Sequence, residues 1–372
     1  MDRTFAYFPG CSADTTGISY TMSMNYVNQA IGLNFREIPD WNCCGASAAS
    51  VENRDLGYAL PARSLALAET LPGNPDVVAP CASCYNNLKR ASVAARNDDE
   101  LRRHLSQLIK MPFQASNNVV SLLELFARPE MVELIKQRAM KSLNGVKLAC
   151  YYGCTLVRPA SICEFDDVEN PTSMDTLMAA VGAEPVEWGF KTECCGASNQ
   201  VIVADETRPL INRIYRNAQA CGAEAIVTAC PLCWLNLDMR EDEINRKFNT
   251  DYDMPVFYFT QILALAMGAT LKQAGIDKHF KDATGFVKEV MARKAEPKMT
   301  DKERRIAEAK AKAAARKKAE AAAKSKQASG APSPGDTPAS GSTPAAASDN
   351  AAVTPPSPAT EPAAANKEGV NA

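Results

Sequence analysis

The chain has 372 residues, of which 46% are hydrophobic and 23% charged, and a formal net charge of −2. That length accommodates two domains and an extension, and the near-neutral charge gives no bias toward nucleic acid or an anionic membrane. Thirteen cysteines are many for a chain that begins Met1-Asp2-Arg3-Thr4, without a charged and then apolar leader. The sequence therefore predicts a cytoplasmic protein, and in that reducing compartment cysteines hold metal more often than they form disulfides.

The first part of the chain alternates short apolar runs with helical stretches. Strands are expected at residues 5–8, 34–38 and 76–79, and helices at about 17–31, at 55–71 and from residue 80 onward. One cysteine element follows each strand: Cys11, then Cys43-Cys44, then Cys81-Ala82-Ser83-Cys84. This pattern predicts a parallel α/β unit with a site at the ends of its strands. Residues 98–143, including the apolar run 119–126, are expected to form helices that lead to the next unit.

The second part repeats the plan with a period of about 145 residues, which is too long for a solenoid repeat. Strands are expected at 146–151, 184–188 and 225–228, followed by Cys154, Cys194-Cys195 and Cys230-Pro231-Leu232-Cys233. The phrase Cys-Cys-Gly-Ala-Ser occurs at 43–47 and again at 194–198, and an Asn-Leu pair follows each last cysteine. No stretch reaches the roughly 18 to 20 apolar residues of a membrane span. The nearest run, 256–271, contains Thr260 and Gln261 and predicts a buried helix.

These elements predict two Rossmann-like α/β domains related by a pseudo-twofold axis. We expect the first cysteine-rich domain, with its helical linker, at 1–143 and the second at 144–290. A basic, alanine- and lysine-rich helix is expected at 291–328, because alanine favours helix and Thr300 to Glu303 can form a capping box. The Ala/Pro/Ser mixture of residues 329–372 predicts a disordered tail.

Five cysteines in each half exceed the four thiolates of a tetrahedral zinc site or a single cubane cluster. The side chains of two adjacent cysteines rarely bind the same metal atom. Five cysteines are therefore accommodated more naturally by a bridging thiolate or by an expanded iron–sulfur cluster. Zinc at the Cys-x-x-Cys pairs and a set of disulfides remain alternatives at this point. Gly10, Gly45, Gly153 and Gly196 allow the backbone to approach a bulky inorganic group closely.

The remaining residues with reactive side chains lie outside this pattern. Cys163 and Cys221 are expected to be buried, inert thiols, and Cys150 is interpreted as a core thiol, with a supporting role beside the second motif as the alternative. Arg158 is interpreted as a surface residue, with pairing to an anionic substrate as the alternative. Neither histidine, His104 nor His279, falls within a motif.

The doubled pattern Cys-xₙ-Cys-Cys-Gly-xₙ-Cys-x-x-Cys resembles the cysteine-rich (CCG) domain found in the B subunit of heterodisulfide reductase. The resemblance covers residues 4 to about 270, including Cys150-Tyr151-Tyr152-Gly153-Cys154 and the run 255–258. It implies two noncubane 4Fe–4S clusters, each bound through five cysteines. Carried over residue by residue, one cluster uses Cys11, Cys43, Cys44, Cys81 and Cys84, and the other uses Cys154, Cys194, Cys195, Cys230 and Cys233. A disulfide substrate lies between the clusters in that family and is cleaved in one-electron steps.

The resemblance also implies partner proteins. The chain has no ferredoxin-type cysteine run and no Gly-x-Gly-x-x-Gly after a strand, so electrons are expected from two partners, a ferredoxin-like C subunit and a flavin-containing A subunit. Two alternatives remain open. One is a bacterial heterodisulfide-reductase-like protein of sulfur oxidation, acting on a protein-bound or small sulfur substrate. The other is a non-catalytic iron–sulfur electron-transfer component of a membrane-associated oxidoreductase.

Overall fold

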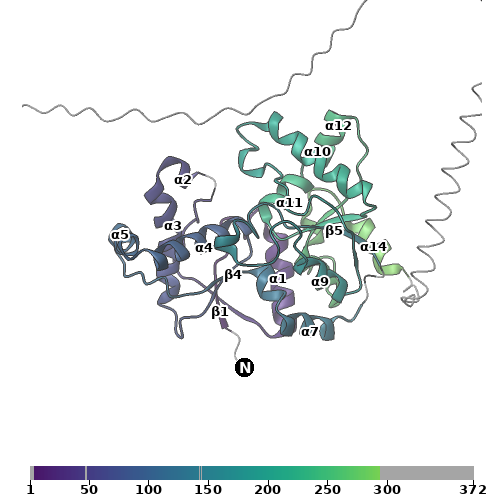
Figure 1. Cartoon of the computed structure of the whole chain (residues 1–372). Coiled ribbons are helices and arrows are strands. Elements are labelled where there is room, and N and C mark those ends of the chain that lie inside the picture. Colours follow the sequence, from purple (N-terminus) through teal and green to yellow (C-terminus); the bar gives the residue numbers. More distant parts are fainter. Residues whose placement is uncertain (1–3, 47, 142, 144, 294–372) are drawn as a thin grey trace, which may run out of the picture. The chain divides into compact units, whose positions relative to one another are not determined.

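The computed structural model describes residues 4–46, 48–141, 143 and 145–293, and these residues belong to one compact unit (Figure 1). Apart from residues 291–293, the predicted basic helix and tail lie outside the described part. We call the described residues up to 143 the first half and those from 145 onward the second half. The division into domains within this unit stays a prediction.

The first half forms a four-stranded parallel sheet in the order β2-β1-β3-β4. Its strands are β1 (Thr4–Tyr7), β2 (Asn34–Glu37), β3 (Val77–Ala79) and β4 (Val119–Ser121). Its helices are α1 (Ile18–Ile31), α2 (Ala49–Glu52), α3 (Arg54–Glu69), α4 (Ala82–Asn97), α5 (Asp99–Ile109), α6 (Leu122–Phe126) and α7 (Pro129–Arg138). The register places Phe5 opposite Phe35 and Val77 opposite Val119. The apolar strands β3 and β4 are buried along their whole length, as is typical of a parallel sheet covered on both faces.

The second half repeats this topology in the order β6-β5-β7-β8. Its strands are β5 (Lys147–Tyr151), β6 (Glu184–Pro185), β7 (Ala225–Thr228) and β8 (Val256–Tyr258). Its helices are α8 (Ala160–Cys163), α9 (Ser173–Ala180), α10 (Ala204–Ala220), α11 (Pro231–Asp238), α12 (Glu241–Phe248), α13 (Phe259–Ala266) and α14 (Thr284–Ala292), with 3-10 turns at Ala197–Asn199 and Ile276–Lys278. The shared strand order confirms the predicted parallel α/β class and its repetition.

One expectation is wrong in the same way in both halves. The runs 119–126 and 256–271 were each expected to be helical throughout, but each begins with a three-residue strand, β4 or β8, and turns directly into a helix, α6 or α13. In both halves, the backbone amide of the last strand residue donates a hydrogen bond to the side chain of the residue three positions later. Glu124 is the acceptor for Ser121, and Gln261 is the acceptor for Tyr258. Because no glycine or proline separates strand from helix, the apolar run reads as continuous.

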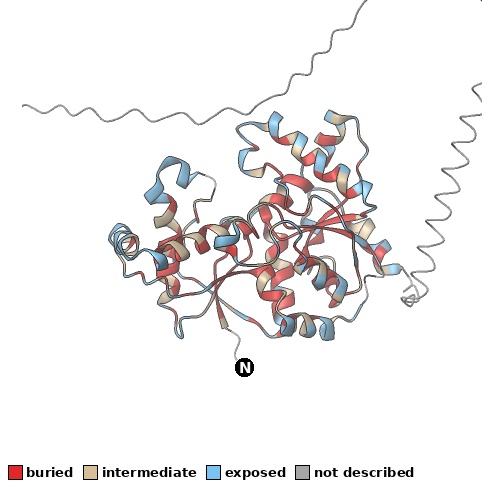
Figure 2. Ribbon diagram, in the orientation of Figure 1, coloured by how far each residue is buried: buried red, intermediate tan, exposed pale blue. Residues whose placement is uncertain are grey.

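The two halves share one hydrophobic core (Figure 2). Helix α1 of the first half packs against α13 of the second, and α9 of the second packs against α6 of the first. At the first of these contacts the Ser23 and Thr260 hydroxyls lie 2.7 Å apart, and both residues are fully buried. The Phe126 and Phe259 rings meet edge to face, with centroids 5.9 Å apart. This reciprocal packing is the pseudo-twofold arrangement expected from the repeated sequence.

Candidate metal centre

The segments that follow three strands in each half carry the ten motif cysteines, eight of them in loops and two, Cys84 and Cys233, in the first turns of α4 and α11. Cys11 follows β1, Cys43 and Cys44 follow β2, and the last pair follows β3. In the second half Cys154 follows β5, Cys194-Cys195 follow β6, and Cys230 follows β7. Chain connections leave β1 and β3 toward opposite sides of the sheet, and such a switch point is where open parallel sheets bind ligands. We call the five cysteines of the first half the first site, and those of the second half the second site.

In the first site, sulfur atoms from different loops come close together. The Cys44 and Cys84 sulfurs lie 3.3 Å apart, and both side chains are buried, whereas Cys43 is exposed. Interaction with the Cys84 thiol lowers the pKa of Cys44, and interaction with Cys44 raises the pKa of Cys84 well above its ordinary value. The pKa of Cys11 is raised, first by partial burial of its sulfur and then by the charges of Cys43 and Cys44, although the residue as a whole is exposed. The five thiols therefore act on one another as a group.

The second site repeats these contacts. The Cys195 and Cys233 sulfurs lie 3.6 Å apart and are buried. The Cys154 thiol lowers the pKa of Cys194 to about 6 by hydrogen bonding, and Cys194 in turn raises the pKa of Cys154. At neutral pH this favours a thiolate at Cys194, and the thiolate is the form that binds metal.

The two sites meet at Cys81 and Cys230, which we call the junction. A hydrogen bond with the Cys230 thiol is the main cause that raises the pKa of Cys81. Hydrogen bonds with Cys233 and, second, with Cys81 lower the pKa of Cys230. The Tyr20 hydroxyl lies 3.4 Å from two carbonyl oxygens, those of Pro80 and Ala229, which directly precede the two cysteines. One buried tyrosine thus contacts equivalent positions in both halves and holds the junction together.

A glycine is required in each Cys-Cys-Gly turn. Gly45 and Gly196 have φ of +73° and +79°, a region that strains any residue with a side chain. A Cβ atom would lie 2.6 Å from Ala49 Cβ at Gly45, and 2.8 Å from Thr207 Cβ at Gly196. The backbone amides of both glycines donate to the sulfur of the cysteine two positions earlier, at 3.5 Å and 3.3 Å. Such amide donors tune the potential of a sulfur-ligated cluster.

An asparagine secures each turn from behind. The Asn87 side-chain amide donates to the Cys44 carbonyl oxygen at 3.0 Å, and Asn236 donates to the Cys195 carbonyl oxygen at 2.7 Å. Both asparagines are buried and stand three residues after the last cysteine of their site. The repeated Asn-Leu pair was visible in the sequence, but its role as a support for the turn was not.

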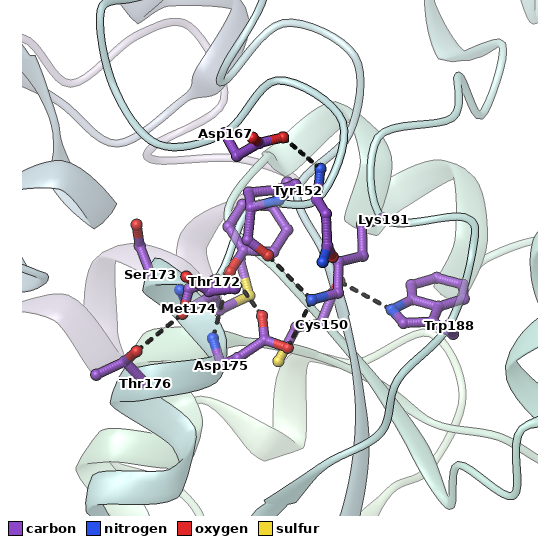
Figure 3. A network of polar contacts seen from close by, with 12 residues as sticks. Cys150, Tyr152, Asp167, Thr172, Ser173, Met174, Asp175, Thr176, Trp188 and Lys191 are labelled. Atoms are coloured by element: carbon purple, nitrogen blue, oxygen red, sulfur yellow. Dashed lines mark hydrogen bonds and ion pairs between the residues drawn. The ribbon is translucent and has the colours of Figure 1, made fainter.

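A buried ion pair lies beneath the second site (Figure 3). The Lys191 ammonium, with 2% of its side chain exposed, lies 2.9 Å from Asp175 Oδ1 and donates to the Pro171 carbonyl oxygen at 3.0 Å. The Tyr152 hydroxyl donates to Asp175 Oδ2 at 2.7 Å. The Lys191 carbonyl oxygen accepts from the amides of Tyr152 and Gly153, so the network joins the Cys154 loop to the Cys194 loop. No sequence pattern marked Lys191 or Asp175 as part of the site.

The first half has no matching ion pair at the equivalent position. Lys191 precedes Cys194 by three residues, and Asp40 precedes Cys43 by three. Asp40 pairs with Arg63, but the Asp40 side chain is 79% exposed. The two sites therefore differ in their surroundings although their cysteines match.

The other candidate residues fall as follows. Cys150 and Cys163 are buried thiols as expected, and burial raises the pKa of both. Cys221 was also expected to be buried, but it is exposed, because it caps the carboxyl end of α10 where the helix meets solvent. Arg158 pairs with Glu169 at 3.0 Å and donates to the Val168 carbonyl oxygen, which agrees with a surface role.

The two histidines contribute to packing. His104 lies 3.1 Å from Asp55 on the surface. The buried His279 contacts Gln261, and its ring meets Trp234 edge to face with centroids 5.3 Å apart. Trp234 directly follows Cys233, so His279 supports the second site from behind although it falls outside the motif.

The donor set of each site suits some metal groups better than others. In the described part of the chain, no three Cys, His, Asp or Glu side chains are arranged as ligands of a single metal ion. Each site nevertheless offers five thiols from three chain segments and an amide donor toward a sulfur. A Cβ at Gly10 or Gly153 would lie only 3.1 Å from the sulfur of Cys84 or Cys233, so glycine leaves room there. These features fit a sulfur-ligated group of several metal atoms.

Comparison with known proteins places the chain in a family. Residues 5–89 and 148–238 match the family described as CCG, cysteine-rich domain. The chain is 30% identical over 257 residues to the B subunit of ferredoxin:CoB-CoM heterodisulfide reductase from Methanosarcina mazei, an alignment that covers 68% of this chain and 85% of that one. The chain belongs to the heterodisulfide reductase B-subunit family with its duplicated CCG domain. As a member of this family it is an iron–sulfur, metal-binding oxidoreductase subunit.

Two further similarities qualify this result. The chain is 32% identical over 286 residues to the 8-methylmenaquinol:fumarate reductase membrane anchor subunit of Wolinella succinogenes, covering 76% of this chain and 99% of that one. A crystal structure of a hypothetical protein from Helicobacter pylori aligns with a TM-score of 0.61 at 14% identity, over 77% of this chain and about half (53%) of that one. The latter shows a shared fold. No helix in the described residues combines the length and the apolar character that crossing a membrane needs.

Proposed function

We propose that the chain is the catalytic subunit of a heterodisulfide-reductase-like complex that cleaves or forms a disulfide between two noncubane 4Fe–4S clusters. The first site would bind one cluster through Cys11, Cys43, Cys44, Cys81 and Cys84. The second would bind the other through Cys154, Cys194, Cys195, Cys230 and Cys233. One observation carries the proposal: the two sets of five thiols belong to separate sheets, and yet one tyrosine, Tyr20, contacts the carbonyl oxygens that directly precede Cys81 and Cys230.

The protein's own groups prepare both sites for such clusters. Thiol–thiol hydrogen bonds lower the pKa of Cys44 and Cys194, and a lower pKa favours the thiolate form that binds metal. The cysteines at the junction are buried, so water is excluded where a substrate sulfur would lie. Cys11, Cys43 and Cys194 are exposed, which leaves each site a route by which iron and sulfide can enter during cluster assembly.

Two clusters suit one disulfide because its reduction to two thiols consumes two electrons and two protons. When bound, the clusters would supply the two electrons one at a time. In this proposal the electrons come from partner proteins, a ferredoxin-like C subunit and a flavin-containing A subunit. Support comes from the relatives, which are named as subunits of reductases that act with ferredoxin or a quinol. We also propose a cytoplasmic location, with membrane association through partners alone, and two domains that divide near residue 143.

A second function has its own support. The chain is 32% identical to a fumarate reductase subunit over 99% of that protein. The corresponding values for the heterodisulfide reductase subunit are 30% and 85%. In this alternative the same two clusters would carry electrons between a quinol and a partner enzyme, with no substrate at the junction. Within the main proposal, the substrate is either a small disulfide or a protein-bound sulfur, as in bacterial sulfur oxidation.

Anaerobic reconstitution of the full chain with iron and sulfide tests both functions. Two 4Fe–4S clusters correspond to about eight irons per chain. The oxidised protein should then give a new paramagnetic signal when a thiol such as 2-mercaptoethanol is added, because thiol reaches the clusters at the junction. Binding of one zinc and no iron would contradict both functions. Iron binding without any response to thiol would favour the electron-transfer alternative.

A further inference from the structure

Tyr258 carries a buried hydroxyl that has no hydrogen-bond partner. It is the last residue of β8 and is fully buried. Among the tyrosines in the described part of the chain, its hydroxyl alone is both inaccessible and unpartnered. Buried polar groups in folded proteins are nearly always paired, so each exception calls for a physical reason.

Other buried tyrosines make the exception sharper. The hydroxyl of Tyr151 donates to the Glu193 carbonyl oxygen at 2.6 Å, that of Tyr215 to Leu237 at 3.1 Å, and that of Tyr85 to Cys163 at 3.0 Å. Tyr20, directly beside Tyr258, has two carbonyl oxygens at 3.4 Å. The fold thus provides an acceptor for these buried tyrosines and none for Tyr258.

The Tyr258 ring is held on both faces. It stacks on Tyr20 with centroids 4.2 Å apart and an interplanar angle of 8°, and on Trp234 with centroids 5.0 Å apart and an angle of 24°. Strand pairing also places Tyr258 opposite Thr228, two residues before Cys230. A ring clamped in this way cannot swing its hydroxyl toward a distant acceptor. Whatever satisfies the hydroxyl must come to it.

The clamp lies beside the junction of the two sites, because Tyr20, whose ring stacks on Tyr258, has its hydroxyl 3.4 Å from the carbonyl oxygens that precede Cys81 and Cys230. Burial raises the pKa of Tyr258 well above its ordinary value. The hydroxyl therefore stays protonated and remains a donor. A small pocket adjoins this region, and its lining includes Tyr20 together with Pro80 and Pro231, which neighbour Cys81 and Cys230.

We propose that the Tyr258 hydroxyl donates a hydrogen bond to a sulfur acceptor bound at the junction between Cys81 and Cys230. The inference rests on the proposed function, because that function brings sulfur to this point. The acceptor is either an inorganic sulfide of a bound cluster or the sulfur of a bound thiolate. Both present the same chemistry, a negatively charged sulfur in a buried site, and a hydrogen bond to a charged group is stronger than one between neutral groups.

Tyr258→Phe removes the hydroxyl and keeps the stacked ring, and Tyr20→Phe is its matched control. In the metal-free chain, Tyr258→Phe should melt at or above the wild-type temperature, because it replaces an unpaired polar group by an apolar one. Tyr20→Phe should melt lower, because it deprives two buried carbonyl oxygens of their donor. A Tyr258→Phe chain that melts clearly below wild type would show that the hydroxyl already has a partner in the protein, and would overturn the inference.

The iron-loaded chain then distinguishes the two acceptors. If the acceptor is a cluster sulfide, Tyr258→Phe shifts a reduction potential to more negative values without any thiol present, because the donor stabilises the reduced, more negative state. If the acceptor is thiol sulfur, the potential stays constant and half-saturation of the signal induced by 2-mercaptoethanol needs about tenfold more thiol. Unchanged potential and unchanged thiol response, in variants whose wild-type parent binds iron and responds to thiol, would overturn this inference alone. A wild-type chain that binds no iron would overturn the proposed function together with it.

Discussion

Asn87 and Asn236 occupy equivalent positions in the two halves, and each donates its side-chain amide to the carbonyl oxygen of the second cysteine in its own Cys-Cys-Gly turn. Replacing Asn236 with Ala would leave the buried Cys195 carbonyl oxygen unpaired. We expect a loss of about 1–3 kcal/mol in the free energy of unfolding, measured by urea denaturation of the reduced, metal-free chain. The exposed Asn97, at the end of α4, serves as control, and Asn97→Ala should leave stability nearly unchanged. Equal losses in both variants would contradict the role assigned to Asn236.

The turn glycines can be tested against a glycine that has free space. Gly196→Ala combines a positive φ with a Cβ 2.8 Å from Thr207. We expect a loss of about 2–5 kcal/mol, the sum of left-handed strain and overpacking. Gly32 has a similar φ of +71° and nothing within 4 Å of a Cβ, so Gly32→Ala should cost only about 1–2 kcal/mol. Thermal unfolding of both variants measures the difference, and a Gly32 variant that is the less stable of the two would refute the packing argument.

The buried ion pair beneath the second site predicts a difference between the halves. Asp175→Ala strands the Lys191 ammonium and should cost about 3–5 kcal/mol, as breaking a buried pair does. The matched change in the first half, Asp40→Ala, removes a largely exposed partner of Arg63 and should cost about 0–1 kcal/mol. Chemical denaturation of both metal-free variants compares the two. Similar costs would mean that Lys191 finds another partner.

Glu124 provides a pH test away from the cysteines. It forms a capping box with Ser121, and burial raises its pKa above the ordinary value of 4.5. Because the folded state then holds the proton more tightly than the unfolded state, wild-type stability falls as pH rises from about 4.5 through the raised pKa. Glu124→Gln keeps the cap and removes the titration, and Gln261 already fills this role in the second half. The stability of the variant relative to wild type, measured by urea denaturation from pH 4 to pH 8, should grow across that window. Parallel profiles would contradict the prediction.

Each site should load with metal independently. Cys195→Ser removes a buried thiol of the second site, and Cys44→Ser removes its counterpart in the first. We expect each variant to retain about half of the wild-type iron after reconstitution and to keep its far-ultraviolet circular dichroism. Loss of all iron from either variant would show that the sites assemble only together.

Much of this arrangement follows from sequence pattern. Short apolar strands, each followed by a cysteine element, predicted the three segments that form each site. The exact repeat predicted two equivalent sheets. Strands β4 and β8 were missed because each runs directly into a helix without a glycine or proline between them. The exposure of Cys221 was missed because burial of a lone cysteine is only a statistical tendency. Contacts such as Lys191 to Asp175, or Tyr20 to Pro80 and Ala229, join residues whose spacing carries no periodic signal. These contacts depend on how the two halves pack.

The matching strand order of the two sheets indicates that the two halves arose by duplication and then diverged from each other. A half-length protein could form the junction only as a symmetric dimer, in which every substitution appears on both sides of the axis. Joining the halves in one polypeptide removes that constraint. Lys191 can then lie beneath one site while Asp40 occupies the equivalent position in the other, and a single Tyr258 can serve a junction built from two different halves. Covalent fusion thus lets the surroundings of each site change independently of the other.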